Sequence, residues 1–512
     1  MVGLFGTLGT ATSGMSANQV ALQTSSHNIA NTNTDGYSRQ RVLLQTSTPY
    51  SLPGVGTLGT GVQSGGVERI VDDFVRGQIR DSNSQYQFSK QKSDTLGQLE
   101  DMFNEPSDNG LMTQLSTLTS SWTQLANNPE LGTAKTLVIQ NASTFADTLR
   151  GMATNINQLK SDTIQDVAKN ALDFNEKVTQ LKDLNEQIYK LTSQGETPND
   201  LLDSRDSVLK DLSGLANITT TTDKYGRAFV QSDGQDILTV DTQATLSVVV
   251  GSQTGQSTVA KDGNTVNGET TITTAYPAGT ILLTKAGTTA DQSTYSPLTI
   301  STGTLGGLQN SANEIQDRLQ ELNDFAETVA KTTNTVFTDG KQSNSGFFEI
   351  GNDSANYAEN FKVNEALVSD PTTISAGQTA ATGDGSRALA ISKLATTKFG
   401  YPVSTTELAS YDQTTMQFTQ ETSGKTFASA FNNMVTKNGI SKQQADNTSA
   451  AQLSVLNQLE YKNESTSGVS LNEEMSDVIR FQQGFQANAR LLSVVSEMLD
   501  TLINRTGGFR KR

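Results

Sequence analysis

Residues 468–504 decide the fold, and they read GVSLNEEMSDVIRFQQGFQANARLLSVVSEMLDTLIN. Ser470 can cap a helix here, and Glu473 and Glu474 then lie near the positive end of the helix dipole. Apolar residues recur in alternating steps of four and three, which is the period of a coiled-coil seam that needs a partner helix. The apolar seam positions are Leu471, Met475, Val478, Phe485, Ala489, Leu492, Leu499 and Ile503, interrupted by Gln482 and Ser496.

The first thirty residues offer that partner, because the same step pattern recurs there. Asn18 and Ser25 are its polar positions. We therefore predict paired N- and C-terminal coiled-coil helices. Two uses of such a pair stay open, since it can assemble subunits into a polymer or close the core of a monomeric bundle. The apolar positions of the first seam are Leu4, Leu8, Ala11, Met15, Leu22 and Ile29.

Composition limits the kinds of partner. The 512 residues are enough for several domains, yet only 34% are hydrophobic and 6% are aromatic, which favours slender domains or burial completed by assembly. The formal net charge of −16 argues against nucleic acid, because phosphate binding needs clustered Lys and Arg. The short basic tail, with Arg505, Arg510, Lys511 and Arg512, is interpreted as a solvated end.

The chemistry available to the chain is narrow. It has no cysteine, and His27 is the sole histidine, so a disulfide framework, a histidine-based metal site and a Ser/His/Asp triad all lack necessary parts. We expect no catalytic, cofactor-binding or metal-binding residues and no enzyme activity, and we interpret His27 as a polar residue at a helix end. The sequence shows neither a signal peptide nor an apolar run of transmembrane length. We therefore expect export without a cleaved signal and no membrane insertion.

Between the two ends we predict a mainly α fold with an inserted β domain. Residues 1–37 and 465–512 form the terminal coiled-coil domain, and residues 38–70 form an extended, Gly-rich joint. Residues 71–216 and 303–464 form a rod-like helical body with short β segments. Within this body we expect one very long helix at 133–193 and a last helical pair at 427–435 and 447–461.

The inserted β domain is predicted at residues 217–302. Short alternating runs rich in Thr and Val are separated there by turn signals such as Asp233-Gly234. We expect this small domain to face solvent at the tip of the rod. Just before it, Asp203, Arg205 and Asp206 crowd charges near a helix start, and we interpret them as a cap with surface ion pairs, each contributing under ~1 kcal/mol.

One stretch carries a family resemblance. Residues 16–37, which end in SHNIANTNTDGY, resemble the N-terminal motif shared by bacterial flagellar rod, hook and hook-associated proteins. The runs LLDSRD at 201–206 and GTLGGL at 303–308 and the helix at 468–504 are similar to hook-associated members of that family, in the same order. The β insertion shows no such similarity. The motif residues are Asn28, Asn31, Gly36, Tyr37, Ser38, Arg39 and Gln40.

The resemblance implies a secreted structural subunit of the extracellular flagellum, which forms the junction between hook and filament by polymerising through its terminal helices. The partners that it implies are the chain itself, in a ring or helical layer, the flagellar hook protein, a second hook–filament junction protein, and an export chaperone on the C-terminal helix. Two alternatives remain: another axial flagellar protein such as the hook protein, or a secreted adhesin that uses the β insertion.

Overall fold

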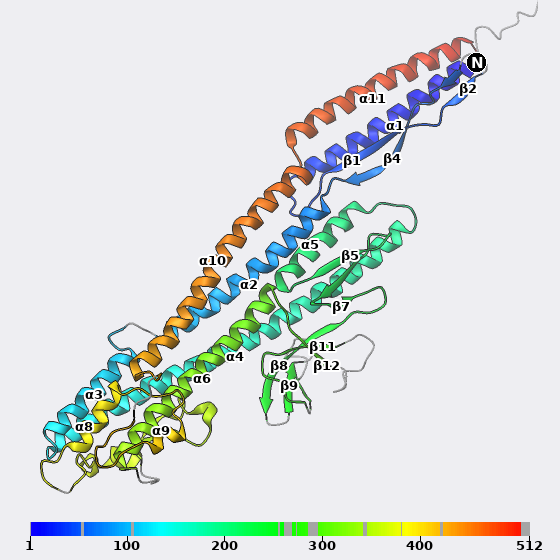
Figure 1. Ribbon diagram of the computed structural model, residues 1–512. Helices are drawn as coiled ribbons and strands as arrows, with labels where there is room; N and C mark the ends of the chain where they lie inside the picture. Colours follow the sequence, from blue (N-terminus) through cyan, green and yellow to red (C-terminus); the bar gives the residue numbers. More distant parts are fainter. Residues whose placement is uncertain are drawn as a thin grey trace, which may run out of the picture.

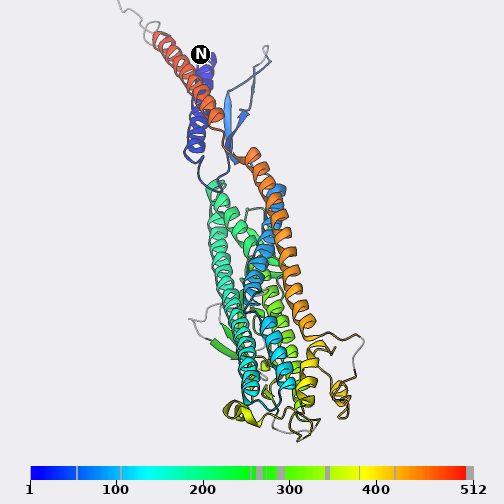
Figure 2. The same ribbon diagram turned by 90° about the vertical axis from the view of Figure 1, so that its left-hand side faces the viewer.

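A computed structural model of the chain describes every residue except 1, 53–55, 104–106, 254–255, 261–268, 273, 285–294, 341–345, 380, 420–422 and 503–512. The molecule is elongated, and long helices run along its axis (Figure 1). The two terminal helices lie together at one end, and the remaining helices form a separate body (Figures 1 and 2). Within the described residues, no helix combines the length and the apolarity that crossing a membrane requires.

The terminal helices are α1 (Val2–Ala30) and α11 (Leu471–Asp500). They pack against each other and run in opposite directions, because both chain ends lie at the outer end of the pair (Figure 1). The pair lies beyond the body and does not cover the body's core. This rules out the alternative in which the terminal helices close a monomeric bundle.

The stretch predicted as an extended joint is a β ribbon. Strands β1 (Gln40–Thr46) and β4 (Val62–Arg69) pair in antiparallel fashion, with a register shift between Val42 and Leu44. Strands β2 (Tyr50–Leu52) and β3 (Gly56–Leu58) form a second, shorter pair. Both β1 and β4 pack along α1, so the ribbon belongs to the terminal helices (Figure 2). We call α1, α11 and β1–β4 the terminal unit.

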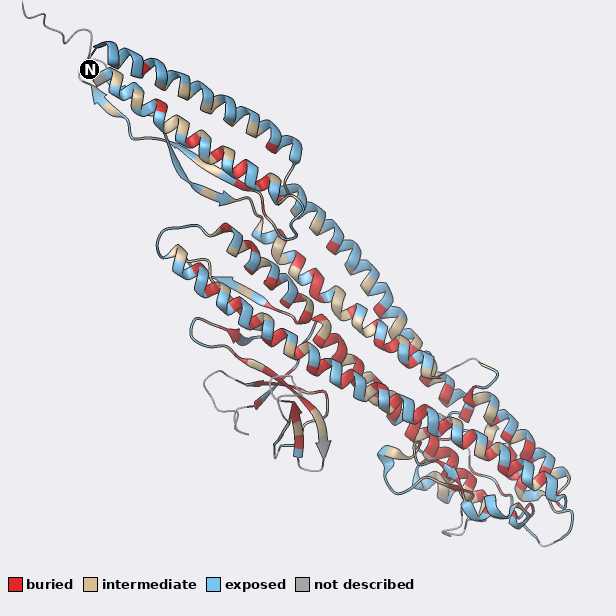
Figure 3. Ribbon diagram, turned by 180° about the vertical axis from the view of Figure 1, so that it is seen from behind, coloured by how far each residue is buried: buried red, intermediate tan, exposed pale blue. Residues whose placement is uncertain are grey.

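The body is built on long helices whose apolar faces meet along its axis. The predicted long helix is α4 (Gly132–Thr192), whose 61 residues span about 90 Å at ~1.5 Å per residue. Its first half packs in one core and its second half in another, so a single helix connects the two (Figure 3). The other long or medium helices of the body are α2 (Asp73–Phe103), α3 (Leu111–Asn127), α5 (Asn199–Leu215) and α6 (Gly303–Phe337).

The predicted last helical pair is wrong, because α10 (Phe427–Ser467) is one continuous helix. The polar residues at 436–446 suggested a break. They continue the helix because their side chains contact α2, against which α10 packs. The buried Asn438 donates to the Leu96 carbonyl oxygen at 3.1 Å, and Asp446 accepts from Ser93.

The β insertion is present, but it does not lie at the tip. It packs against the flank of α4, where Val167, Ala171 and Phe174 contribute to a shared core with the strands (Figure 1). One sheet has the order β5-β6-β7 and the other β10-β9-β8-β11-β12, with all pairs antiparallel. The strands are β5 (Thr219–Thr222), β6 (Ala228–Ser232), β7 (Gln235–Leu238), β8 (Thr245–Gln253), β9 (Gln256–Ala260), β10 (Glu269–Ile272), β11 (Ile281–Thr284) and β12 (Tyr295–Leu298).

The far end of the rod is instead formed by α3 and the short elements that follow α6 (Figure 1). Short β segments, which the sequence predicts within the body, occur here as the antiparallel pair β13 (Phe348–Glu349) and β14 (Lys362–Val363). An aromatic cluster fills this end, in which Phe347 lies 5.0 Å from Trp122 between ring centroids. The short helices are α7 (Glu365–Ser369), α8 (Ser386–Lys393) and α9 (Thr405–Ala409).

We predict that replacing residues 217–302 by a short linker yields a folded but less stable chain. The splice is geometrically feasible, because a Cβ on Gly303 would lie 2.5 Å from the Ala216 nitrogen, so the two ends of the insertion touch. The deletion uncovers Val167 and Phe174, and burial of each such side chain contributes about 1.5–3 kcal/mol. Thermal unfolding should shift to lower temperature and binding of an apolar dye should rise. The same deletion with Val167→Gln and Phe174→Gln should lose the dye binding, whereas an unchanged melting temperature in the simple deletion would contradict this packing.

Candidate assembly interface

The terminal helix pair uses a different face of α11 from the predicted one. Of the predicted seam positions, Val478, Phe485, Leu492 and Leu499 are partly covered. Leu471 and Met475, however, are 47% and 57% exposed, while Glu474 and Val495 are buried. Every second seam position of α11 therefore lies one residue earlier than predicted, as Glu474 does relative to Met475. Ala489 is half-buried, and Ile503 falls outside the described residues.

The predicted seam positions of α1 are all at least partly covered. Ala11 is buried, and the other predicted positions, Leu4, Leu8, Met15, Leu22 and Ile29, are half-buried. A second face of α1, which includes the buried Ala17 and Ala21, is available to the β ribbon that packs on this helix. Helix α1 is thus covered by α11 on one face and by the β ribbon on another, whereas α11 is covered mainly by α1.

Two reciprocal contacts fix the register of this pair. A Cβ on Gly14 would lie 2.9 Å from the Asn488 amide, and a Cβ on Gly484 would lie 2.6 Å from Oδ1 of Asn18. Each asparagine also donates to the backbone of the glycine four residues before it, at 2.7 Å for Asn18 and 2.9 Å for Asn488. Each helix therefore places an asparagine over the glycine of its partner. Seam counting missed this, but the Gly-x-x-x-Asn spacing repeated on both helices is a visible signal.

The motif that follows α1 is organised by Asn28, whose side chain is buried. Its amide nitrogen donates to the Gln40 carbonyl oxygen at 2.9 Å, and its Oδ1 accepts from the Gln40 backbone nitrogen at 3.0 Å. The same oxygen accepts from the Tyr37 hydroxyl at 2.8 Å. Asn28 therefore imitates a β-strand partner for Gln40. The turn closes because Gly36 adopts a φ of 75°, and Asn31 donates to the His27 carbonyl oxygen at 3.0 Å.

The chain crosses between the terminal unit and the body three times, at residues 35–39, 69–72 and 467–470, and we call these segments the neck (Figure 2). Arg39 lies at their centre. Its backbone nitrogen donates to the Ser467 carbonyl oxygen at 2.8 Å, and its carbonyl oxygen accepts from the Ile70 nitrogen at 2.8 Å. Its guanidinium pairs with Glu474 at 2.7 Å and with Glu473 at 2.9 Å. One residue thus ties all three crossings to the start of α11.

A buried network on α5 holds the neck to the body. Asp203 accepts from the Ser38 backbone nitrogen at 3.0 Å and from Arg69 at 2.7 Å. Asp206 accepts from Arg69 at 3.0 Å and pairs with Arg76 and Arg205. The predicted surface ion pairs are therefore wrong, because the neck covers these side chains and leaves them at most 12% exposed. We call Ser38, Arg69, Arg76, Asp203, Arg205 and Asp206 the neck network.

Three arginines face two aspartates in this network. Burial by itself raises the pKa of Asp206, but the opposing effect of Arg205, Arg69 and Arg76 is greater and holds that pKa below its usual value. The stabilising contribution of the Asp206 carboxylate is therefore complete above about pH 4 and is lost as the pH falls through its lower, folded-state pKa. Burial also raises the pKa of Tyr37, and the nearby Asp200 and Asp203 add to that effect.

Two polar contacts extend the attachment. Gln40 donates to Asp200 at 2.9 Å and accepts from Asn199 at 3.2 Å, which ties the first strand to the start of α5. His27 Nε2 lies 3.4 Å from Asp200 on the exposed side of the same helix, so it is the helix-end residue that the sequence suggested. Within the described part of the chain, no group of His, Asp and Glu is arranged to hold a metal ion.

We predict that Asp203→Ala loosens the neck by about 3–5 kcal/mol, because three buried guanidinium groups then share the single carboxylate of Asp206 and the Ser38 nitrogen loses its acceptor. Hydrogen exchange at the Arg39 and Gln40 amides should accelerate accordingly. Asp200→Ala on the same helix is the matched control. Its carboxylate is well exposed, so the change should stay under ~1 kcal/mol. Equal effects of the two substitutions would show that the buried network does not hold the neck.

We also predict that Gly14→Leu and Gly484→Leu each destabilise the terminal unit, since the new side chain must displace the facing asparagine. Gly9→Leu is the control on the same helix, because a Cβ there meets nothing within 4 Å. Its replacement should gain up to ~1 kcal/mol of helix propensity. Hydrogen exchange across α1 and α11 would measure both effects. Equal hydrogen-exchange rates in the Gly14→Leu and Gly9→Leu variants would contradict the Gly–Asn contacts that set the register of the two helices.

Comparisons with known proteins agree with this architecture. Residues 96–353 match the family described as the Flagellar hook-associated protein FlgK helical domain. Residues 8–37 match the family described as Flagella basal body rod protein, and residues 463–505 match the Flagellar basal body rod FlgEFG protein C-terminal family. These two matches fall on the neck motif with α1 and on α11.

Full-length relatives carry one name. The chain is 28% identical to Flagellar hook-associated protein 1 of Bacillus subtilis (strain 168), over 99% of both chains. It is 24% identical to the protein of that name in Escherichia coli (strain K12), over 96% of this chain and 98% of the relative. The solved flagellar hook junction protein FlgK from Burkholderia pseudomallei shares the fold, with a TM-score of 0.59 at 15% identity, covering 76% of this chain and 100% of the other. With its helical domain matched across half its length and its ends matching the rod and hook families, the chain belongs to the flagellar hook-associated protein FlgK family.

Proposed function

We propose that the chain is a structural subunit of the junction between flagellar hook and filament, and that it polymerises through the terminal unit. Relatives named Flagellar hook-associated protein 1 match it over almost their whole length, which supports this role. The terminal unit is separate from the body, so it can contact neighbours without unfolding the core (Figure 1).

The observation that carries this proposal is the apolar surface that α11 leaves uncovered. Val494 and Met498 are 55% and 54% exposed, although α1 covers the opposite face of the same helix. Large apolar side chains gathered on an exposed face are typical of interaction sites. The exposed apolar residues of α11 are Leu471, Met475, Ile479, Leu491, Val494 and Met498, and Leu502 follows directly after the helix.

The charge distribution supports the same role. Residues 1–34 contain no Asp, Glu, Lys or Arg, and neither do residues 42–67, so α1 and most of the ribbon carry no formal charge. The net charge of −16 is therefore concentrated elsewhere in the chain. Contacts that copies make through α1 and this part of the ribbon avoid the repulsion that their acidic bodies would produce at close range.

Several finer assignments belong to this proposal. Residues 1–37 and 465–512 form the assembly domain, 38–70 form the β ribbon that packs on it, 71–216 with 303–464 form the body, and 217–302 form an insertion on the flank of α4. The seam residues of α1 and α11 hold the two helices together as one interface. The motif from Asn28 to Gln40 attaches this helix pair to the body. The partners are further copies, the hook protein, a second junction protein and, before export without a cleaved signal, a chaperone on α11. Catalysis is not part of this role.

Electron microscopy of purified hooks incubated with the full chain tests the proposal. Val494→Asp and Met498→Asp should abolish capping of hook ends, because each places a charge in the contact. Both side chains are more than half exposed in the single chain, so circular dichroism and thermal unfolding should not change. Leu389→Asp on α8, where the leucine is 43% exposed, is the control and should cap normally. Normal capping by both α11 variants would refute assembly through this face.

A further inference from the structure

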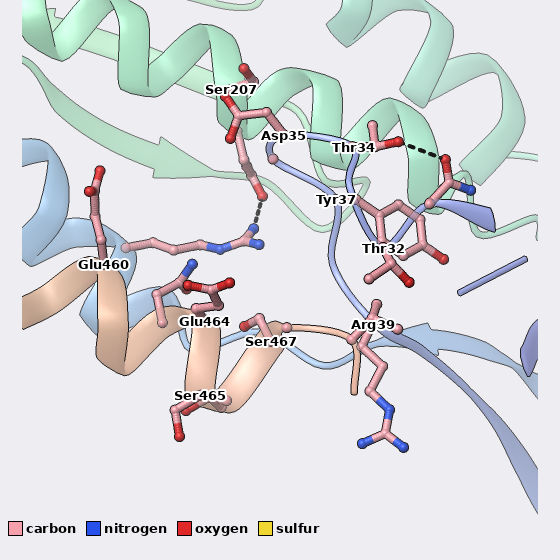
Figure 4. Close-up of a pocket in the computed structure, with 18 of the residues that line it drawn as sticks. Thr32, Thr34, Asp35, Tyr37, Arg39, Ser207, Glu460, Glu464, Ser465 and Ser467 are labelled. Atoms are coloured by element: carbon pink, nitrogen blue, oxygen red, sulfur yellow. Dashed lines mark hydrogen bonds and ion pairs between the residues drawn. The ribbon is translucent and has the colours of Figure 1, made fainter. Parts of the chain in front are cut away.

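A polar cavity of ≈ 830 Å³ lies at the neck, between the turn after α1, helix α5 and the end of α10 (Figure 4). This volume is within the ~300–1,000 Å³ of ligand-binding clefts. In Figure 4, Asp35 and Tyr37 line one wall, and Glu464 and Ser467 line the wall formed by α10. The cavity is thus enclosed by elements of both the terminal unit and the body.

The polar groups of this cavity are only partly satisfied within the chain. Ser467 is 3% exposed and its Oγ has no hydrogen-bond partner among the described residues, and Oδ1 of Asn463 is likewise buried without one. Lys210 pairs with Glu460 at 2.6 Å, while the exposed carboxylates of Asp35 and Glu464 make no ion pair with any described residue. Arg39 and Arg76, which also line the cavity, are in ion pairs, and Arg80 donates to the Thr220 hydroxyl at 3.1 Å. The remaining groups named here are mainly hydrogen-bond acceptors. They suit an occupant that carries several positively charged donors.

The chain itself contains such a segment. Residues 503–512 read INRTGGFRKR and carry four basic residues. They follow α11 at the end of the helix that is distant from the neck (Figure 1). The 30 residues of α11 span ~45 Å, whereas ten residues reach at most ~35 Å when fully extended. The tail therefore cannot return along α11 to the cavity at the neck of its own chain.

We propose that the basic tail of one copy, residues 503–512, docks in the neck cavity of a second copy. Arg510, Lys511 and Arg512 pair with Asp35 and Glu464, and the buried Ser467 and Asn463 receive further donors. The contact joins two different surfaces and is therefore heterologous, so it propagates along an array. This inference rests on the proposed assembly through the terminal unit and adds an axial contact to it.

Binding of a labelled synthetic peptide, residues 503–512, to the full-length chain in solution tests the docking without requiring assembly. Fluorescence anisotropy should detect saturable binding that weakens as salt is added. A peptide with Arg510→Ala, Lys511→Ala and Arg512→Ala should bind about 10-fold more weakly, since it lacks the charges that pair with the cavity carboxylates. Equal affinity of the two peptides would overturn the proposal.

Substitutions of the cavity carboxylates test whether the peptide binds in the neck cavity. The double variant Asp35→Asn and Glu464→Gln should weaken binding of the unmodified peptide about 5-fold or more. Asp166→Asn, on the exposed face of α4 away from the cavity, is the control and should not change it. Binding that ignores the cavity substitutions would place the tail elsewhere and overturn the assignment.

Because the chain has no cysteine, a cross-link can report the contact in the assembled state. Copies carrying Asp35→Cys mixed with copies carrying Lys511→Cys should form dimers with a short bismaleimide when both cap hook ends. Pairing Asp166→Cys with Lys511→Cys should not. Normal hook capping without the first cross-link would overturn the tail as occupant and leave the proposed function standing. Cross-linking of Asp35→Cys to the hook protein in its place would assign the cavity to that partner.

Discussion

The pairing of Asp203 and Asp206 with the arginines around Ser38 is the interaction on which the arrangement of the chain depends. Three crossings of the neck connect the terminal unit to the body, and none of them is supported by an apolar core of its own. The orientation of the terminal unit relative to the body must therefore be set by polar contacts. Buried ion pairs can fix an orientation, because their geometry is specific even where their net contribution to the folding free energy is modest.

The charges at 203–206 show where the sequence was informative and where it was not. Helix α5 and its acidic residues were visible in the sequence, but their burial depends on Arg69 and Arg76, which are more than a hundred residues away in the chain. The pattern of residues within α5 cannot show that distant parts of the chain bury its charged side chains. The family motif at Ser38 gave the better signal, since its hydroxyl and its backbone nitrogen both contact Asp203.

Periodicity predicted the long elements well and their faces less well. The helix at 132–192 and both terminal helices follow from apolar repeats. On α11 the count favoured Met475 over Glu474, because a carboxylate is not expected to be buried. Arg39 reverses that preference by pairing with Glu474 at 2.7 Å. The β insertion was found from its composition, but its place on the flank of α4 depends on tertiary contacts that composition does not contain.

The terminal unit and the body solve the burial problem differently. The body layers several helices and two sheets, so its long helices find apolar neighbours on more than one side. Two paired helices share only one face, and the ribbon covers a second face of α1 alone. Among the described residues, helix α11 consequently keeps apolar side chains such as those of Val494 and Met498 in solvent, and contact with another molecule would bury them. The need for assembly thus follows from the number of layers at each end, because a single helix pair cannot complete its own core.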